Sequence, residues 1–169
     1  MTSWKTKPKP VLGIDIGRVI IHGDGPDTNF VGAGTDEEAL EAPAMAGAFD
    51  AITRLVTLFE GRVWIVSKCG KKVENRSRLW LRHHRFHEVT GIDASRLRFC
   101  RDRREKAPIA LDLGIGYFID DRIDVLRAME GIVPRRYLFG AAQSPDPHIE
   151  AAPTWAVTET LVTEVVLAA

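Results

Sequence analysis

Val11-Leu12-Gly13-Ile14-Asp15 is a short apolar run that ends in an aspartate, and Gly116-Tyr117-Phe118-Ile119-Asp120-Asp121 repeats this pattern. Short runs without polar residues are typical of parallel strands that are buried on both faces. In an open parallel sheet, polar groups that follow the carboxyl ends of the strands gather in one crevice, where ligands bind. The two runs therefore predict that Asp15, Asp120 and Asp121 meet at one edge of a sheet.

Outside these two runs, the sequence alternates between strand-like and helical segments. Strands are predicted over residues 11–16, 62–66, 97–99, 117–119 and 136–139, and helices over 49–59, 73–86, 107–113, 123–129 and 158–167. This alternation favours one α/β domain with a doubly wound parallel sheet. Residues 143–153 are expected to form a proline-rich loop, and the helix after them is expected to cover the edge of the sheet.

Length and composition favour a single domain that follows a short leader. Residues 1–10 are basic and contain prolines, so they are expected to be a flexible leader. With 169 residues, 45 % of them hydrophobic, residues 11–169 can form one domain with its own core. No apolar run has the length of a membrane helix, and the start of the chain lacks the apolar core of a signal peptide. We therefore expect a cytoplasmic protein with no membrane partner.

Charge is distributed unevenly although the formal net charge is zero. From residue 68 to residue 106 there are thirteen Lys or Arg and five Asp or Glu, whereas the remainder has ten and eighteen. A basic region of this kind suggests an anionic substrate, including one with more than one phosphate. Arginine-rich helix faces are also common as plain solvated surface. The two cysteines, Cys69 and Cys100, are too few for a disulfide scaffold and are expected to be reduced thiols.

Ser67 and Lys106 are the further polar residues that suggest a site. Ser67 follows an apolar strand-like run, and the turn after it can offer both a hydroxyl and backbone N–H groups to an anion. Lys106 begins the helical stretch that leads back to the strand before Asp120, where it can supply a positive charge to a phosphate. Each residue alone has an ordinary structural explanation, as does Asp15 in a turn or Asp121 at a helix N-terminus.

The order of these motifs resembles the haloacid dehalogenase superfamily of phosphohydrolases over nearly the whole chain. The resemblance implies a Rossmann-like domain of three α/β/α layers, with Asp15 as the nucleophile. It further implies that Ser67 and Lys106 hold the phosphoryl oxygens and that Asp120 binds Mg²⁺. Asp15, Asp120 and Asp121 would repel one another at one edge of the sheet unless a cation lay among them, so the residues themselves predict that all three bind a metal ion. Oxygen ligands of this kind suit Mg²⁺. Asp124, about one helical turn after Asp120, is a further candidate ligand.

One position departs from the pattern of that superfamily. Its phosphatases carry a second aspartate two residues after the nucleophile, but here the sequence is Asp15-Ile16-Gly17-Arg18. Loss of such a general acid typically costs about 10²–10⁴-fold in rate. Gly17 can still offer its backbone carbonyl to the metal. Next to the motifs, Arg18 and Lys68 are candidate substrate-binding residues.

The absence of the acid leaves three alternatives open. The substrate can have a good leaving group, as in an acyl phosphate or a phosphoanhydride. His22, Asp24 or Asp27 can supply the acid instead, from a flap over about residues 22–46, where the superfamily inserts a cap. Within this segment, residues 35–38 match a capping box and predict a short helix. The third alternative is that the protein binds phosphate without turnover.

The resemblance, with so small a flap, is closest to small-cap nucleotidase-like members. We therefore expect a Mg²⁺-dependent phosphohydrolase that acts on a small phosphorylated substrate such as a nucleotide, with low or specialised activity. The alternative is a catalytically weak module that binds phosphate or nucleic-acid ends.

Overall fold

The computed structural model describes residues 6–23, 30 and 32–169. Within these residues a six-stranded sheet has the order β3-β2-β1-β4-β5-β6, and all its neighbouring strands are parallel. The strands are β1 (Leu12–Ile14), β2 (Val63–Lys68), β3 (Leu97–Cys100), β4 (Tyr117–Asp120), β5 (Arg135–Phe139) and β6 (Glu150–Ala152). This is the strand order of a Rossmann fold, so the predicted parallel α/β architecture is confirmed.

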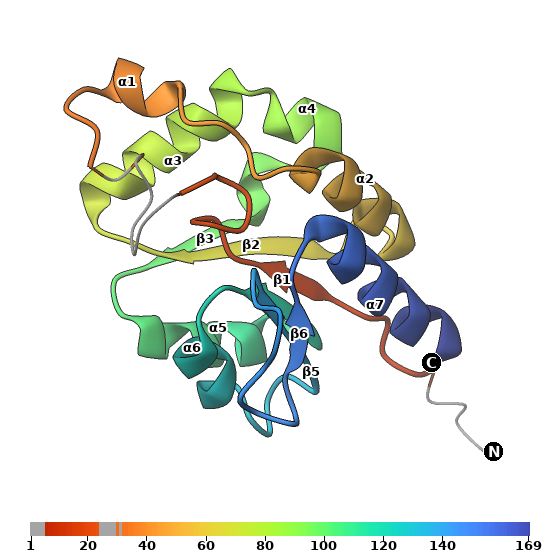
Figure 1. Cartoon of the computed structure of the whole chain (residues 1–169). Coiled ribbons are helices and arrows are strands. Elements are labelled where there is room, and N and C mark those ends of the chain that lie inside the picture. The colour runs from red at the N-terminus through yellow and green to blue at the C-terminus, as the bar shows by residue number, and fades with distance from the viewer. Residues whose placement is uncertain (1–5, 24–29, 31) are drawn as a thin grey trace.

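Helices cover both faces of this sheet, which gives three layers (Figure 1). The α-helices are α1 (Asp36–Leu40), α2 (Ala48–Leu58), α3 (Lys71–His83), α4 (Phe86–Thr90), α5 (Lys106–Asp112), α6 (Ile123–Ala128) and α7 (Trp155–Ala168), and two short 3-10 helices are η1 (Ala94–Arg96) and η2 (Arg103–Glu105). Helices α5 and α6 lie on one face, whereas α2, α3, α4 and α7 lie on the other.

Side chains of the central strands alternate between the two cores. Leu12 and Ile14 of β1 are fully buried in the core beneath α2 and α7. Phe118 of β4 is buried in the opposite core, beneath α5 and α6. Because successive residues of a strand point to opposite faces, a sheet covered by helices on both sides needs strands without polar residues. The apolar runs of the sequence meet this need.

The boundary between β1 and β4 is where the winding of the chain reverses. From β1 the chain passes to β2 through α2 on one face, and it returns to β4 through α5 on the other face. The loops after β1 and β4 therefore diverge and leave a crevice between them, the usual ligand position in open α/β sheets. The two strands stay joined at this point, because the backbone N–H of Asp15 donates to the carbonyl of Ile119 at 3.0 Å.

The chain turns tightly after β1, and the C-terminal helix holds this turn. Arg18 has a left-handed backbone with a φ of 58°, and its N–H donates to the carbonyl of Ile21 at 2.9 Å. The indole N–H of the buried Trp155, at the start of α7, donates to the carbonyl of Val19 at 2.7 Å. The turn over residues 16–21 is therefore fixed by a helix that is distant in the sequence.

Three elements differ from the predictions. Residues 143–153, predicted as a loop, contain β6, which pairs with β5 although Ala151 and Ala152 have low strand propensity. Helix α3 ends at His83 and does not continue to Phe86, because Arg85 has a left-handed φ of 56° and is the N-cap of α4. Helix α7 covers a face of the sheet next to α2, not the sheet edge, because its apolar side chains join the core on that face.

The segment predicted as a flap lies against α3 where it is described. The predicted short helix is α1, and the hydroxyl of its N-cap, Thr35, accepts from the N–H of Glu38 at 3.1 Å. Glu38 accepts in turn from the N–H of Gly34, so the reciprocal bond of a capping box is shifted by one residue. Buried Arg76 of α3 donates to Asp36 at 2.7 Å and holds the segment in place. Asp24 and Asp27 lie outside the described residues.

The residues before β1 contact the body of the domain where they are described. Lys9 forms an ion pair with Glu60 at 2.9 Å, and the carbonyl of Pro10 accepts from Arg62 at 2.9 Å. The packed part of the domain therefore begins shortly before β1. None of the helices in the described part of the chain has the length and apolar character that crossing a membrane requires.

Gly13, in the middle of the sheet, is expected not to tolerate a methyl group. A Cβ at this position would lie 2.6 Å from Cδ2 of Phe118, which is itself fully buried. We expect Gly13→Ala to lower the free energy of unfolding by about 1–3 kcal/mol through overpacking. Urea unfolding measures this change, with Gly116→Ala as the matched control, because no atom lies within 4 Å of a Cβ at that position. Equal losses in both variants would show that crowding at Phe118 is not the cause.

Candidate active site

Three carboxylates meet at the carboxyl ends of β1 and β4. Asp15 follows β1 directly, Asp120 is the last residue of β4, and Asp121 is next to it. One carboxylate oxygen from each of the three lies within 4.8 Å of the others. Asp15 is 7 % exposed and Asp120 is fully buried, so water does little to reduce their repulsion. The residues that the sequence predicts to share a metal ion therefore lie close enough to share one.

Lys106 joins two of these carboxylates. It is the first residue of α5, and it is only 3 % exposed. Its Nζ donates to Oδ1 of Asp15 at 2.9 Å and to Oδ2 of Asp120 at 2.7 Å. The turn before α5 is set by a capping box between Asp102 and Glu105, which aims Lys106 toward the sheet. A buried lysine held in this way has a fixed position relative to both aspartates.

The charges of the group shift the pKa values of its members. Burial, together with the negative charge of Asp15, raises the pKa of Asp120 to about 7, although Lys106 opposes this rise. Burial and Asp15 also raise the pKa of Asp121, against the opposing charge of Arg18. Burial acts to lower the pKa of Lys106, but the attraction of Asp120 and Asp15 outweighs it, so the net shift is upward. The ammonium is therefore charged, while the carboxylates are crowded with negative charge.

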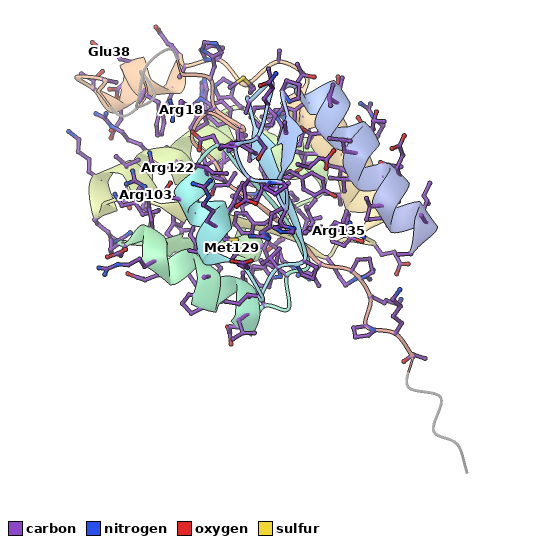
Figure 2. The ribbon with its side chains drawn as sticks, turned by 60° about the horizontal axis from the view of Figure 1, so that its bottom comes forward. Arg18, Glu38, Arg103, Arg122, Met129 and Arg135 are labelled. Atoms are coloured by element: carbon purple, nitrogen blue, oxygen red, sulfur yellow. The ribbon has the colours of Figure 1, made fainter. Side chains whose placement is uncertain are left out.

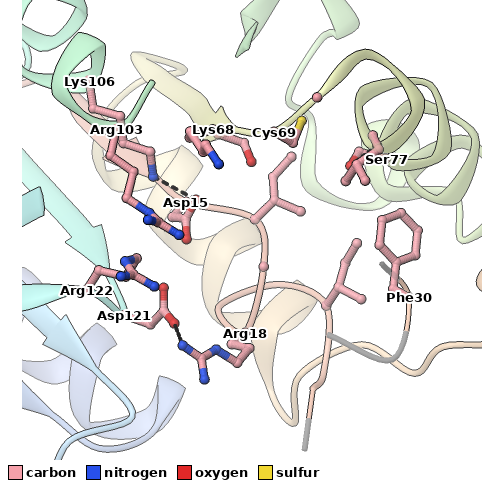
Figure 3. A pocket seen from close by; sticks show the side chains of 16 residues that line it. Asp15, Arg18, Phe30, Lys68, Cys69, Ser77, Arg103, Lys106, Asp121 and Arg122 are labelled. Carbon is pink, nitrogen blue, oxygen red and sulfur yellow. Dashed lines mark hydrogen bonds and ion pairs between the residues drawn. The ribbon is translucent and has the colours of Figure 1, made fainter. Parts of the chain in front are cut away.

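Arg18 forms an ion pair with the third carboxylate, that of Asp121. Its Nη2 is 2.7 Å from Oδ2 of Asp121, and its side chain is partly exposed to solvent. The left-handed turn at Arg18 directs the guanidinium across the crevice from the β1 loop to the β4 loop. Figure 3 shows this ion pair beside Asp15 and the Lys106–Asp15 contact. The substrate-binding role of Arg18 stays a prediction. Its side chain also offsets the negative charge of Asp121.

A cavity of about 330 Å³ opens above these groups. The predicted site residues that line it are Asp15, Gly17 and Arg18 after β1, Ser67 and Lys68 at the end of β2, and Lys106 and Asp121 (Figure 3). Asp120 lies buried beneath them. The hydroxyl of Ser67 has no hydrogen-bond partner among the described residues, so it is available to a ligand. The sequence thus predicted residues from four separate segments that line or support one cavity.

The cavity also has lining residues that the sequence did not predict. Arg103 comes from η2, Arg122 follows Asp121, and Phe30 is buried on the side of the flap segment. The many basic residues before Lys106 indicate that some of them can lie near an anionic ligand. Nothing in the sequence indicates that Arg103 is the arginine that faces the cavity. Cys69 also lines the cavity, and burial raises the pKa of its thiol to about 11, which leaves it protonated and unreactive at neutral pH.

Two candidates lie apart from this group. Asp124 is exposed, and its carboxylate is 3.3 Å from Nε of Arg122, outside the group of three carboxylates. His22, a candidate acid, donates its backbone N–H to the carbonyl of Pro43 and is not one of the described residues that line the cavity. The other two candidate acids, Asp24 and Asp27, cannot be placed because they lie outside the described residues.

The donor set fits a hard divalent cation. All three groups are carboxylates, the ligands that Mg²⁺ prefers, and burial together with the charge of Asp15 raises the pKa of both Asp120 and Asp121. Lys106 engages one oxygen of Asp15 and one of Asp120, and the other oxygen of Asp120 accepts from the backbone N–H of Arg122 at 3.0 Å. Because each carboxylate oxygen has two lone pairs, both groups keep lone pairs for a metal. Oδ2 of Asp121 is buried and makes no well-aligned hydrogen bond despite its short distance to Arg18.

Mg²⁺ is therefore expected to stabilise the folded protein. At a concentration 100 times its dissociation constant, a ligand that binds only the folded state adds about 2.7 kcal/mol to the free energy of unfolding. We expect thermal unfolding with and without Mg²⁺ to show this increment in the wild type and to show its loss in Asp120→Asn. Asp124→Asn is the matched control and should keep the increment, since Asp124 lies outside the carboxylate group. An increment that persists in Asp120→Asn would contradict the assignment.

No family model matches the sequence, and no curated protein is significantly similar to it. The carboxylate–lysine group and the cavity above it are the features of this chain that bear on its function.

Proposed function

We propose that this protein is a Mg²⁺-dependent phosphohydrolase that transfers a phosphoryl group from a small phosphorylated substrate first to Asp15 and then to water. The observation that carries the proposal is the buried Lys106 ammonium, which holds Asp15 and Asp120 side by side at the base of a cavity. The order of the motifs, which resembles the haloacid dehalogenase superfamily, supports the same chemistry.

Asp15 is the proposed nucleophile. Lys106 engages its Oδ1, which leaves Oδ2 to attack the phosphorus atom in line with the leaving group. The new bond joins Oδ2 to phosphorus, while the bond from phosphorus to the leaving oxygen breaks and that oxygen keeps the electron pair. Lys106 offsets the negative charge of both the nucleophile and the phosphoryl group, which would otherwise repel each other.

Metal binding and phosphoryl binding use the other residues of the site. Mg²⁺ would be held by Asp15, Asp120, Asp121 and the carbonyl of Gly17, and it would neutralise charge on the transferred phosphoryl group. The Ser67 hydroxyl donates to a phosphoryl oxygen, for which its position on the cavity wall is suitable. Attack of water on the phosphorus of the aspartyl-phosphate then releases inorganic phosphate and restores the carboxylate of Asp15.

Gly17 limits the range of substrates. With no carboxylate at this position, an alkoxide leaving group receives no proton from the residue that supplies it in the resembled phosphatases. Removal of a general acid costs about 10²–10⁴-fold in rate. We therefore propose that ordinary phosphate esters are poor substrates and that the activity is low or specialised.

A second candidate function is a module that binds phosphate or nucleic-acid ends without turnover. The basic stretch over residues 68–106 favours it, but many of its arginines have carboxylate partners within the domain. Arg78 and Arg101 both contact Glu74, and Arg76 is buried against Asp36. This internal pairing leaves less charge for a long nucleic-acid partner than the sequence suggests, so we favour a small ligand.

A panel of phosphorylated compounds with Mg²⁺ separates the two functions. The enzyme is expected to release inorganic phosphate and to become labelled covalently when the transferred phosphate is radioactive. A binding module would retain the compound, as seen by calorimetry, with neither release nor label. Measurement with EDTA in place of Mg²⁺ shows whether the release depends on the metal.

A further inference from the structure

Positive charge exceeds negative charge in the cavity. Among the described residues, Asp15 and Asp121 line it with Asp120 buried beneath, against five cations: Arg18, Lys68, Arg103, Lys106 and Arg122. When all are ionised, the cations exceed the carboxylates by two, and bound Mg²⁺ would add two more positive charges. One phosphate dianion leaves part of this charge without a counterion. The cavity is therefore suited to a ligand with a second anionic group.

Lys68 and Arg103 are the cations that have no carboxylate within ion-pair distance among the described residues. Lys106 is engaged by two aspartates, whereas Arg18 contacts Asp121 and Arg122 lies 3.3 Å from Asp124. Lys68 ends β2, and Arg103 begins η2 after the neighbouring strand β3.

Both of these side chains are placed to meet a ligand in front of Asp15. In Figure 3 they point into the cavity on the side where Lys106 contacts Asp15. Figure 2 shows Arg103 on the same side of the molecule as Arg122 and Arg18. A group bound between Lys68 and Arg103 would thus be next to a phosphoryl group at Asp15.

The missing acid points to the same kind of ligand. Gly17 supplies no proton, and a leaving group that departs as a stable anion needs none. A phosphate group satisfies this condition because its second pKa is about 6. An alcohol does not, because its alkoxide is strongly basic. Glycine at position 17 and two cations with no carboxylate partner in the described part of the chain are independent observations, and both are explained when the leaving group is itself a phosphate.

We infer that the cavity binds two linked phosphate groups and that the substrate is a phosphoanhydride. The terminal phosphate lies at Asp15, and Lys68 and Arg103 bind the phosphate next to it; the reaction itself rests on the function proposed above. Oδ2 of Asp15 bonds to the terminal phosphorus, and the bond from that phosphorus to the bridging oxygen breaks. The bridging oxygen keeps the electron pair and leaves as part of a phosphate anion, with no proton transfer. Water then hydrolyses the aspartyl-phosphate to inorganic phosphate.

A binding experiment tests the second phosphate position without turnover. In excess Mg²⁺, calorimetry compares methylenediphosphonate, which cannot be hydrolysed, with methylphosphonate. We expect the diphosphonate to bind at least about 10-fold more tightly, since charge-assisted hydrogen bonds to a second phosphate add affinity. Arg103→Ala and Lys68→Ala should each remove most of this advantage.

Arg104→Ala is the matched control for Arg103→Ala. Arg104 lies on the same short helix, but it is exposed, pairs with Asp102 at 2.7 Å and is not among the described lining residues. It should keep the preference for the diphosphonate. Equal affinities for the two phosphonates in the wild type would overturn the inference, as would an Arg104→Ala effect as large as that of Arg103→Ala.

A turnover experiment separates failure of the substrate class from failure of the reaction. Inorganic pyrophosphate and a nucleoside diphosphate are compared with acetyl phosphate, which has a good leaving group but no second phosphate. We expect Arg103→Ala to lower kcat/KM for the better anhydride at least about 10-fold more than for acetyl phosphate. The preferred anhydride shows whether the second phosphate is free or belongs to a nucleotide.

The outcomes of the two experiments are distinct. Turnover of acetyl phosphate that depends on Asp15, without turnover of either anhydride, would reject the inference and leave the proposed hydrolysis standing. Diphosphonate binding that depends on Arg103, with no hydrolysis of any compound, would support the two-phosphate site and reject the hydrolysis.

Discussion

Asp15→Asn is expected to abolish turnover while the protein stays folded. The amide is neutral and a poor nucleophile, so no aspartyl-phosphate can form, and one of the three proposed carboxylate ligands of the metal is weakened at the same time. Loss of a nucleophile from an enzyme typically costs about 10⁴–10⁶-fold in kcat, and we expect a value in this range here. The measurements are phosphate release with Mg²⁺ under saturating substrate and acid trapping of the radioactive phosphoenzyme, which should be lost in parallel.

Two comparisons make the result specific. Asp124→Asn introduces the same chemical change at an exposed aspartate close to the site, and it should leave kcat unchanged. Thermal unfolding of Asp15→Asn should show a folded protein, because asparagine has nearly the same size as aspartate. If Asp15→Asn kept more than a tenth of the wild-type kcat, or still formed a phosphoenzyme, another residue would be the nucleophile.

Lys106→Met is expected to destabilise the domain strongly. Methionine has a similar length but no charge, so Asp15 and Asp120 would face each other without the ammonium between them. Removal of one partner from a buried ion pair typically costs about 3–5 kcal/mol, because the remaining charge is left uncompensated. Urea unfolding in EDTA measures the loss. Lys72→Met, at an exposed position on α3, is the control and should change stability by less than about 0.5 kcal/mol.

The loss of stability caused by Lys106→Met should also depend on pH. The pKa of Asp120 is raised from its usual 3.8 to about 7 by burial and by Asp15, even with Lys106 present. A carboxyl whose pKa is higher in the folded state takes up a proton on folding, so its contribution to stability falls as pH rises from about 4 to about 7. Without Lys106 this pKa rises further, so we expect the cost of Lys106→Met to be greater at pH 8 than at pH 5. Adding Asp120→Asn to Lys106→Met should recover part of the stability; no recovery would mean that the cost does not arise from the buried charge.

Most of the sheet and the centre of the site could be predicted because their signals are local. An apolar run followed by a polar residue fixes both the strand and the position of that residue at its carboxyl end. Asp15, Asp120 and Ser67 were found in this way, and parallel strand order then brings them to one edge of the sheet. Lys106 was found because it begins the helix that returns to β4.

The features that the sequence did not reveal depend on tertiary contacts. Strand β6 has alanines where a typical strand has branched or aromatic residues, and it is defined by its pairing with β5. The contact between Arg18 and Asp121 requires a left-handed backbone at an arginine, a conformation for which local sequence gives no indication. Arg103 faces the cavity while Arg104 faces solvent, a difference set by the short helix that carries both.

The bond from the Trp155 indole to the carbonyl of Val19 connects the site to folding order. It joins residues separated by 136 positions, and because closing a long loop costs conformational entropy, we expect this bond to form late in folding. The turn that follows the proposed nucleophile therefore acquires its final shape late, after the central strands have assembled. An intermediate with a complete sheet but an undocked last helix would have the aspartates in place and still lack a competent ligand pocket.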